Sequence, residues 1–531
     1  MKVDAVPETV KPSSFVELGT GVRFSIFLAL SVIINLLSWP TLFSLDLWVL
    51  KDRGSFLNLD YLIDQHLRLG VDTYYCYGLL PVFLQHWLFV LFGRGYWPLL
   101  GCAAVSMILI SYFCAVLLRY LPSGTIWILA LLAMDRIINS VNPNLPYSLV
   151  QISLLFALFF VLDRRLDLAL AAAAVGCWSV PSLPLVMAVS LVALIIVDWY
   201  LQRPSALKTL LISLLPGALA YVGIGAVLAL QFGWQSVMST STPLAGMAFY
   251  KQVGYGSNHA LMEFLHPPGY STLHYVIYAV LNPVAWWVAS SLILLWFALR
   301  ATRKIIVHRE LEPQSTTIIL CAILQIVLAA AAYGAPHQHY IYDPLLIVGV
   351  LLGISQTTSR SVRQLLMTVF VTLGIVGQAS VLRATLKGWQ QTRSADTANL
   401  YADRGWAGEW KQILALSTQR DLLMLSYSTG VHQYFPSIHS PDVWTIREGQ
   451  SLPDDQARVN HQIDQADVVV LDMTSPVDFD FLKPGTAISS SFCLTSSTQN
   501  FQVWWRRSTV SKGVHCVSSE PATQPITSAQ M

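Results

Sequence analysis

The chain has 531 residues, of which 54% are hydrophobic and only 12% are charged. Soluble domains carry roughly 25% charged residues, so this much apolar surface cannot be buried in an ordinary soluble core. The composition therefore predicts an α-helical polytopic membrane protein. The net charge of +2 comes without a concentrated basic stripe, which argues against a nucleic-acid partner.

The first part of the chain is dominated by apolar runs. Residues 1–22 are predicted to form a cytoplasmic N-terminal segment, and the run after Arg23 has no small-residue cleavage site, which predicts a retained anchor. Runs of near-spanning length predict about eleven transmembrane helices in a domain at 23–383. The predicted spans are 23–44, 96–118, 123–139, 144–162, 167–179, 181–200, 207–232, 271–299, 316–335, 341–357 and 363–383.

Lysine and arginine in the short loops predict the orientation, because cytoplasmic loops carry an excess of positive charge. With the N-terminus inside, the basic loops fall on the cytoplasmic side, whereas the loop 45–95 and the whole C-terminal region fall outside. This N-in/C-out arrangement requires 81–92 to be an interfacial helix, because counting it as a span would reverse every later loop. The basic residues concerned are Arg119, Arg164, Arg165, Arg203, Lys208, Arg300, Arg303, Lys304, Arg309, Arg360 and Arg363.

From about residue 384 the composition becomes that of a soluble domain. Alternating helical patterns and apolar strands predict a small extracytoplasmic α/β domain at 384–516, followed by a disordered tail at 517–531. Cys493 and Cys516 could pair in an oxidising compartment, but their spacing alone does not decide it. The predicted helices are 406–416 and 453–465, and the predicted strands are 421–427, 466–473 and 501–507.

The loop 45–95 concentrates acidic, aromatic and basic residues between two apolar regions. Its apolar spacing predicts an amphipathic surface helix with Asn58 as N-cap and Gly70 as its end. Asp60 would lie in the first turn of this helix, and Asp64 would share its face and pair with Arg68. A second interfacial helix is predicted to open near Pro81, so that the loop contains two such helices.

Each of these residues also has a purely structural interpretation. A carboxylate in a first turn is favoured by the helix dipole, and interfacial tyrosines form the usual aromatic belt. The combination is more informative, because carboxylates gather on the side opposite the arginine-rich loops. Such an arrangement could hold a polar group while an amphiphile stays in the lipid.

At residues 59–81 the pattern Leu-Asp-Tyr, Arg-Leu-Gly, Asp-Thr-Tyr-Tyr and Tyr-Gly-Leu-Leu-Pro resembles the GT-C superfamily of integral-membrane glycosyltransferases. Members take sugars from polyprenyl-phosphate or polyprenyl-diphosphate donors. The resemblance implies an inverting enzyme in the bacterial inner membrane, with its site on the extracytoplasmic side. The acceptor would be a hydroxyl of a glycan, lipid or protein.

The resemblance implies that Asp60 is the catalytic base and that Asp72 is a second carboxylate. A positioned carboxylate can take the proton of an acceptor hydroxyl while the donor bond breaks. The chain departs from better-known members at Tyr61, where a second acid often follows, and it has no Asp-x-Asp. The resemblance allows a divalent cation, Mg or Mn, but this departure argues against a metal site, and no ligands are assigned to it.

Further substrate-binding candidates lie in other outer segments. The resemblance implies donor-phosphate contacts at His337, His339 and Tyr340. Two histidines alone make an incomplete metal site, so none is assigned there. Lys251 is the only Lys or Arg in the long polar loop 233–270, which makes it the natural counter-charge for a phosphate. Two more residues complete the set, namely His259 in that loop and Tyr77 in the loop 45–95.

Two alternatives belong to other functional classes. A transporter or flippase of a lipid-linked sugar would need charges inside the spans, and few are present apart from Asp135 and Arg136. No internal repeat is evident, which also weighs against transporter folds built from inverted halves. The other alternative is a non-catalytic relative that serves as a scaffold in an envelope-polymer assembly.

Overall fold

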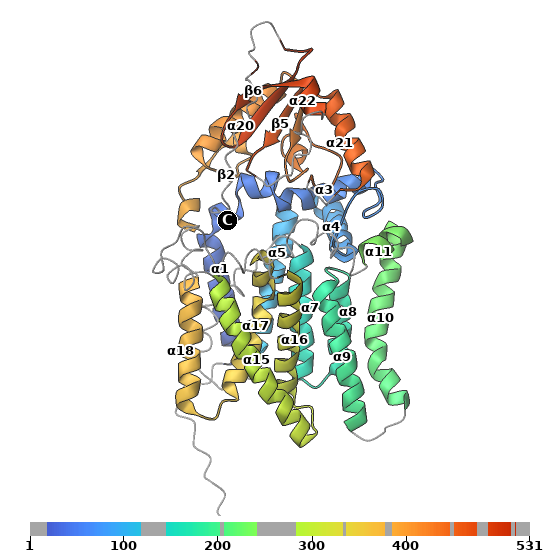
Figure 1. Cartoon of the computed structure of the whole chain (residues 1–531), viewed down its shortest axis with the longest axis vertical. Coiled ribbons are helices and arrows are strands. Elements are labelled where there is room, and N and C mark those ends of the chain that lie inside the picture. The colour runs from blue at the N-terminus through green and yellow to red at the C-terminus, as the bar shows by residue number, and fades with distance from the viewer. Residues whose placement is uncertain are drawn as a thin grey trace, which may run out of the picture.

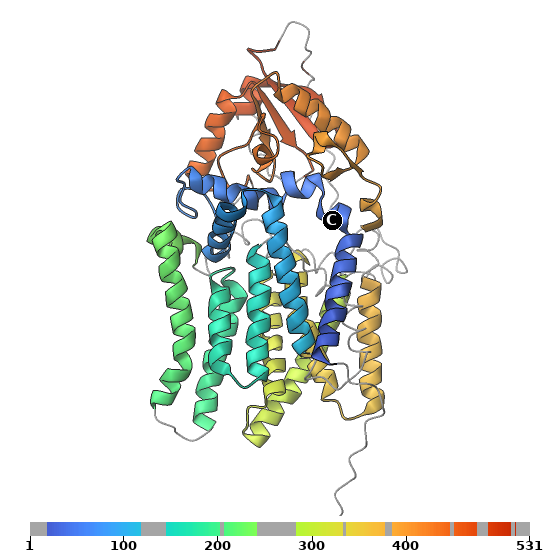
Figure 2. The same ribbon diagram turned by 180° about the vertical axis from the view of Figure 1, so that it is seen from behind.

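The computed structural model describes residues 19–117, 145–201, 207–241, 283–332, 336–377, 385–446, 451–474, 487–510 and 516. A bundle of long helices occupies one end of the molecule, and a small sheet flanked by helices occupies the other (Figures 1 and 2). Short helices from the loop 45–95 lie between these two parts in both views. The chain is thus organised as a membrane bundle, a connecting layer and a soluble domain.

Each predicted span overlaps a helix except 123–139, which lies outside the described residues, as do parts of 271–299, 316–335 and 363–383. Five of the described helices, α1, α5, α7, α9 and α10, are long and apolar enough to cross a membrane. The bundle helices are α1 (Thr20–Leu37), α5 (Tyr96–Leu117), α7 (Leu145–Leu162), α8 (Leu166–Cys177), α9 (Ser182–Leu201), α10 (Leu207–Phe232), α15 (Pro283–His308), α16 (Pro313–Ala332), α17 (Pro336–Ser355) and α18 (Arg360–Gly377).

The bundle helices are apolar on both inward and outward faces. Leu154 and Leu158 of α7 and Met187 of α9 are fully buried among their neighbours, whereas Leu230 of α10 is 90% exposed. A helix that is hydrophobic all round needs an apolar environment on its outer side as well. Lipid supplies that environment, which agrees with a protein that crosses the membrane several times.

The connecting layer differs from the prediction at its main helix. Its elements are α2 (Trp39–Leu42), the short π-helical segment η1 (Asp46–Leu50), α3 (Asp52–Asp64), α4 (Leu79–Phe92) and α11 (Trp234–Thr240). The predicted start after Asn58 is wrong, because Asn58 lies inside α3 and its buried amide donates to Thr429 Oγ1 (2.8 Å) of the soluble domain. The predicted end at Gly70 is also wrong, since α3 ends at Asp64 and Gly70 lies in a later turn with φ +75°.

The soluble domain is built on a five-stranded mixed sheet of order β4-β3-β5-β7-β6, in which β3 runs parallel to β4 and β5 and β7 runs antiparallel to β5 and β6. A separate antiparallel pair joins β1 and β2. The strands are β1 (Thr392–Arg393), β2 (Tyr401–Ala402), β3 (Leu422–Leu425), β4 (Ile438–His439), β5 (Val468–Asp472), β6 (Phe492–Ser497) and β7 (Phe501–Arg506). The helical elements are η3 (Ala395–Thr397), α20 (Arg404–Ser417), η4 (Val431–Gln433), α21 (Pro453–Gln465) and α22 (Ala487–Ser491).

Side chains alternate between the two faces of a sheet along each strand, so this sheet has an apolar surface on both faces. One helix covers each of them. Leu422 and Met424 of β3 pack with α20, whereas Leu423 and Leu425 pack with α21. The α20 face also takes Trp48 of η1 into its core. The connecting layer is therefore part of the hydrophobic core of the soluble domain.

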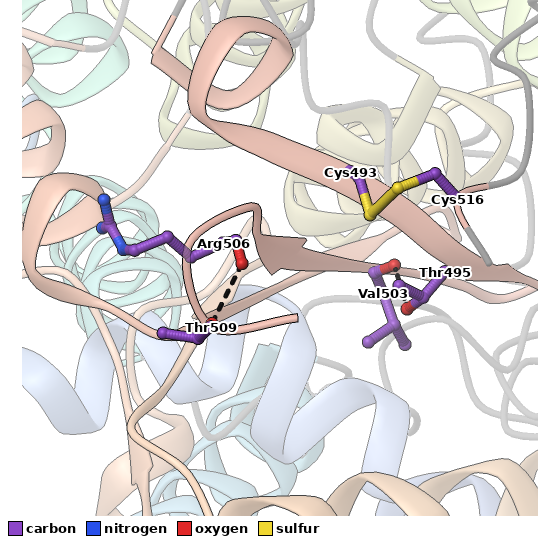
Figure 3. The surroundings of a disulfide bond; sticks show 6 residues. All are labelled: Cys493, Thr495, Val503, Arg506, Thr509 and Cys516. Atoms are coloured by element: carbon purple, nitrogen blue, oxygen red, sulfur yellow. Dashed lines mark hydrogen bonds between the residues drawn. A yellow bond between two sulfur atoms is a disulfide. The ribbon is translucent and has the colours of Figure 1, made fainter. Parts of the chain in front are cut away.

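The predicted helices and strands of this domain are confirmed as α20, α21, β3, β5 and β7. Strands β4 and β6 were not predicted, because β4 has two residues and β6 ends in polar Thr495 and Ser496. The open question of the two cysteines is answered by a disulfide between Cys493 and Cys516, whose Cα atoms are 5.5 Å apart (Figure 3). The disulfide ties residue 516 to strand β6.

The soluble domain contacts the connecting layer through backbone as well as side chains. The Ser428 N–H donates to the Leu50 carbonyl at 3.1 Å. At the same place Gly54 of α3 approaches Gly430 so closely that a Cβ on Gly430 would lie 2.2 Å from the Gly54 carbonyl oxygen. Only glycine fits on both sides of this contact, which holds α3 in a fixed position beneath the sheet.

Candidate active site

Asp60 lies at the centre of a charged cluster between α3 and α4. Its Oδ1 is 2.7 Å from Nδ1 of His86, and its Oδ2 accepts from Nε and Nη2 of Arg94 at 2.9 and 2.6 Å. Asp60 is only 5% exposed. Arg94 also donates to Asp64, so a single guanidinium binds two carboxylates one turn apart on α3.

Local backbone geometry brings these three groups together. His86 lies on α4, and Arg94 follows Gly93, the C-cap residue of that helix. Gly93 has φ +82°, a conformation that L-residues with a side chain rarely adopt, and it turns the chain so that Arg94 reaches back to α3. Asp60 itself lies in the second half of α3 and not in its first turn, so the predicted helix-dipole interpretation does not apply.

The predicted ion pair between Asp64 and Arg68 is wrong. Arg68 lies beyond the end of α3 and binds Asp72, with Nε and Nη2 donating to the carboxylate at 2.9 and 2.8 Å. The hydrogen bonds from Arg68 hold the pKa of Asp72 below its ordinary value. Asp60 and Asp72 therefore bind two different arginines.

The turn that carries Asp72 is attached to the soluble domain. Arg458 of α21 donates through Nη2 to the Asp72 carbonyl oxygen at 2.5 Å, and the Tyr74 N–H donates to Asp455 at 2.9 Å. Asp455 is fully buried and is bound by Arg458. These contacts fix the turn at the junction between the loop and α21.

A polar cavity of about 390 Å³ opens between α3 and the soluble domain. Tyr61, the neighbour of Asp60, forms its α3 side, and His432, His439 and Asp442 line it from the domain. The Tyr61 and His432 rings lie 4.5 Å apart. The cavity thus begins one residue from the buried carboxylate.

Burial controls the protonation of the groups around this cavity. Burial lowers the pKa of His432 to about 4, so its ring is neutral at physiological pH. Burial, together with the charge and hydrogen bond of Asp442, raises the pKa of Tyr61. The positive charge of Arg94 lowers the pKa of both residues. It therefore opposes the rise at Tyr61 and adds to the fall at His432.

The other predicted site residues are distributed as follows. Tyr77 lies in an aromatic cluster with Trp444, and its hydroxyl is 2.5 Å from that of Tyr147 on α7. Lys251 and His259 lie outside the described residues. The backbone of the three α17 candidates is helical, but their side chains are also outside the described part of the chain; they are His337, His339 and Tyr340.

Within the described ranges, no group of three or more His, Cys, Asp or Glu side chains is arranged to hold a metal ion. The two predicted carboxylates do not form a ligand pair, because each binds its own arginine. A requirement for a divalent cation therefore stays a prediction.

Arg94 and His86 were not among the predicted site residues. A signal was present, because Arg94 is the only Lys or Arg between Arg68 and Arg119. In the predicted orientation it lies at the outer end of an apolar segment, against the positive-inside tendency. A basic residue kept on that side needs an anionic partner, and here the partners are Asp60 and Asp64.

No protein-family model and no curated protein matches the chain. Its fold is similar to that of ArnT from Cupriavidus metallidurans bound to undecaprenyl phosphate, with a TM-score of 0.50 and 13% identity over 92% of this chain and 98% of ArnT. The apo structure of the same protein covers 90% of this chain and 98% of its own length, at 14% identity and a TM-score of 0.44. At this level of identity the likeness shows that the chain shares the fold of ArnT.

Proposed function

We propose that the protein is a membrane glycosyltransferase that moves a sugar from a polyprenyl-phosphate-linked or polyprenyl-diphosphate-linked donor to an acceptor hydroxyl. The observation that carries this proposal is the Asp60 carboxylate, buried against Arg94 next to a polar cavity. The bound lipid of the ArnT structure supports a polyprenyl donor. Sugar and acceptor are left unassigned.

In this proposal Asp60 is the general base of an inverting displacement. The acceptor oxygen forms a bond to the anomeric carbon and gives its proton to Asp60, while the bond from that carbon to the phosphate oxygen breaks. The electron pair leaves with the phosphate, whose growing negative charge needs a nearby cation. Arg94 supplies that cation, because its guanidinium already lies against Asp60.

The same contact implies an exchange of partners when the donor binds. Three of the roughly four acceptor positions of the Asp60 carboxylate are occupied, and Arg94 takes both of those on Oδ2, so a shift of Arg94 frees Oδ2 to take the proton. A donor phosphate competes with Asp60 and Asp64 for the Arg94 guanidinium, and its binding releases Asp60 toward the acceptor. His86 then keeps the carboxylate oriented through its Nδ1.

The remaining predictions complete the proposal. Lys251, His337, His339, Tyr340, Tyr77 and His259 are proposed to contact the substrates. Asp72 is proposed to position the loop through its contacts with Arg68 and α21. We further propose about eleven spans with the N-terminus inside, and an extracytoplasmic site at the bacterial inner membrane. Activity with and without a chelator tests whether Mg or Mn is required.

Sugar transfer by the purified protein in nanodiscs tests the proposal directly, with a panel of polyprenyl-linked sugars as donors. Asp60→Asn removes the base and is expected to lower the rate by about 10²- to 10⁴-fold. Asp64→Asn is the matched control, since Asp64 binds the same Arg94 from an exposed position, and it is expected to retain most activity. Full activity of a folded Asp60→Asn protein would overturn the assignment of the base.

The same materials separate the alternatives. A flippase would move a labelled polyprenyl-linked sugar across the bilayer without changing it chemically. A scaffold would tolerate the double change Asp60→Asn with Asp72→Asn in a cellular assay of envelope-polymer assembly. An enzyme is expected to fail in that assay, because the first change removes its base.

A further inference from the structure

A second polar cavity lies at the opposite end of the helix bundle. It has a volume of about 540 Å³ and lies between the C-terminal parts of α15 and α17. These helix ends lie at the end of the bundle remote from the sheet (Figures 1 and 2). The polar residues lining the cavity are Arg300, Arg303, Lys304, His308, Gln356 and Thr357.

The positive charge of this cavity is only partly neutralised. Lys304 binds Glu312 at 2.6 Å. Arg300 lies over the Trp296 ring, with its guanidinium carbon 4.9 Å from the ring centroid, and this contact leaves its charge uncompensated. Across the described ranges, neither Arg300 nor Arg303 has a carboxylate within ion-pair distance. Two guanidinium groups are thus available to an anion in the cavity.

The surroundings of the cavity are apolar and exposed. Leu299 and Ile306 of α15 are 64% and 69% exposed, and Val307, which lines the cavity itself, is 66% exposed. Phe297 forms part of the cavity wall. Arginine stems commonly run along such apolar surface while their charged groups reach the membrane interface. An anion that also carries acyl chains matches this combination of charge and exposed apolar surface.

We propose that the cavity between α15 and α17 binds the phosphate headgroup of an anionic phospholipid in the membrane leaflet opposite the soluble domain. Arg300 and Arg303 bind the phosphate, and Gln356, the residue after α17, adds a hydrogen bond through its side-chain amide. The acyl chains lie along the exposed apolar side of α15. A bound lipid then links α15 to α17, the helix that carries three of the predicted substrate-binding residues at its other end.

Lipid titration of the purified full-length protein in a neutral detergent tests this site. Phosphatidylglycerol is expected to raise the midpoint of thermal unfolding, whereas phosphatidylcholine raises it much less. The double variant Arg300→Gln with Arg303→Gln is expected to weaken the apparent affinity for phosphatidylglycerol about tenfold or more. Equal effects of the two lipids on the unmodified protein would overturn the proposal without any variant.

Arg360→Gln with Arg363→Gln is the matched control, because these arginines lie on α18 outside the cavity and the charge change is the same. This control is expected to keep the response to phosphatidylglycerol. An equal loss in both double variants contradicts a defined site and leaves only the general attraction of basic loops for anionic lipid. Inorganic phosphate is titrated in the same way. If it stabilises the protein as strongly as phosphatidylglycerol does, the proposal of a lipid ligand is overturned. The single change Arg303→Gln, at an exposed residue, repeats the test if the double variant does not fold.

Discussion

The two carboxylates predicted for the site both bind arginine, but the two pairs are built differently. The Asp60 pair joins α3 to the residue after α4, and the Asp60 side chain is only 6% exposed. The Asp72 pair closes a turn of five residues, and the side chain of its partner Arg68 is 52% exposed. One pair is a buried tertiary contact and the other is a local surface contact.

This difference explains why the same two residue types have different consequences. Removing one partner of a buried pair leaves an uncompensated charge away from water, which typically costs about 3–5 kcal/mol. An exposed pair is worth only about 0–1 kcal/mol. Asp60 therefore takes part in a buried contact between α3 and the residues after α4, whereas Asp72 mainly shapes the turn that contacts α21.

The largest expected effect is at the buried pair. Arg94→Gln is expected to lower the stability of the protein by about 3 kcal/mol, because the buried Asp60 then keeps only His86 as a partner. Adding Asp60→Asn removes the charge of Asp60 and is expected to restore much of the loss. Denaturant unfolding of both single variants and the double variant gives the coupling energy. Additive effects would show that the two side chains do not interact as the contact at 2.6 Å implies.

An intermediate effect is expected at Asp472, a buried carboxylate at the end of β5. Thr474 donates two hydrogen bonds to its Oδ1, and its Oδ2 has no partner among the described residues. Burial raises the pKa of Asp472 to about 6, with a further contribution from the charge of Asp46. It is thus a carboxylate buried like Asp60 but without an arginine.

Asp472→Asn is expected to stabilise the protein at pH 7.5, by up to about 2–3 kcal/mol. The folded state binds the proton of Asp472 more tightly than the unfolded state, so wild-type stability falls as the pH rises from about 4 to about 6 and is then constant. The gain in stability from Asp472→Asn should grow over the same pH range and vanish near pH 4. Thermal unfolding measured across this range checks the sign, and a variant that is less stable at pH 7.5 contradicts it.

The smallest effect is expected at the surface pair. Asp72→Asn should cost less than about 1 kcal/mol at pH 7, because Arg68 remains solvated. The pKa of Asp72 is lowered, so the contribution of this pair is present above the unfolded value of about 3.9 and is lost as the pH falls below it. A double-variant cycle with Arg68→Gln measures the pair in the same way as for Asp60. A coupling energy as large as that of the buried pair would remove the distinction between the two.

Sequence patterns were sufficient where one local signal decided the structure. The helix α21 begins at Pro453 and ends at Gln465 as predicted, because proline favours the first helical turn and a buried strand follows. The apolar bundle helices were found for a similar reason, since a spanning helix needs a long uninterrupted apolar run.

Patterns failed where a distant contact decided the structure. The helix was predicted to start after Asn58, but α3 begins at Asp52 and continues through Gly54, where the soluble domain packs against it. Asn58 resembled an N-cap by type, while its amide binds Thr429, which is distant in the sequence. The pairing of Arg94 with Asp60 likewise depends on how α4 returns to α3.

The close approach of Gly54 and Gly430 limits how the molecule can admit its substrates. With the two backbones in direct contact and the Ser428 N–H bonded to Leu50, there is no space at this junction for a hinge. The soluble domain and the α3 layer are thus joined through their backbones at this junction. In the proposed function, an acceptor enters through the cavity past Tyr61 and His432 and a donor arrives from the lipid, so the two substrates reach Asp60 by separate routes.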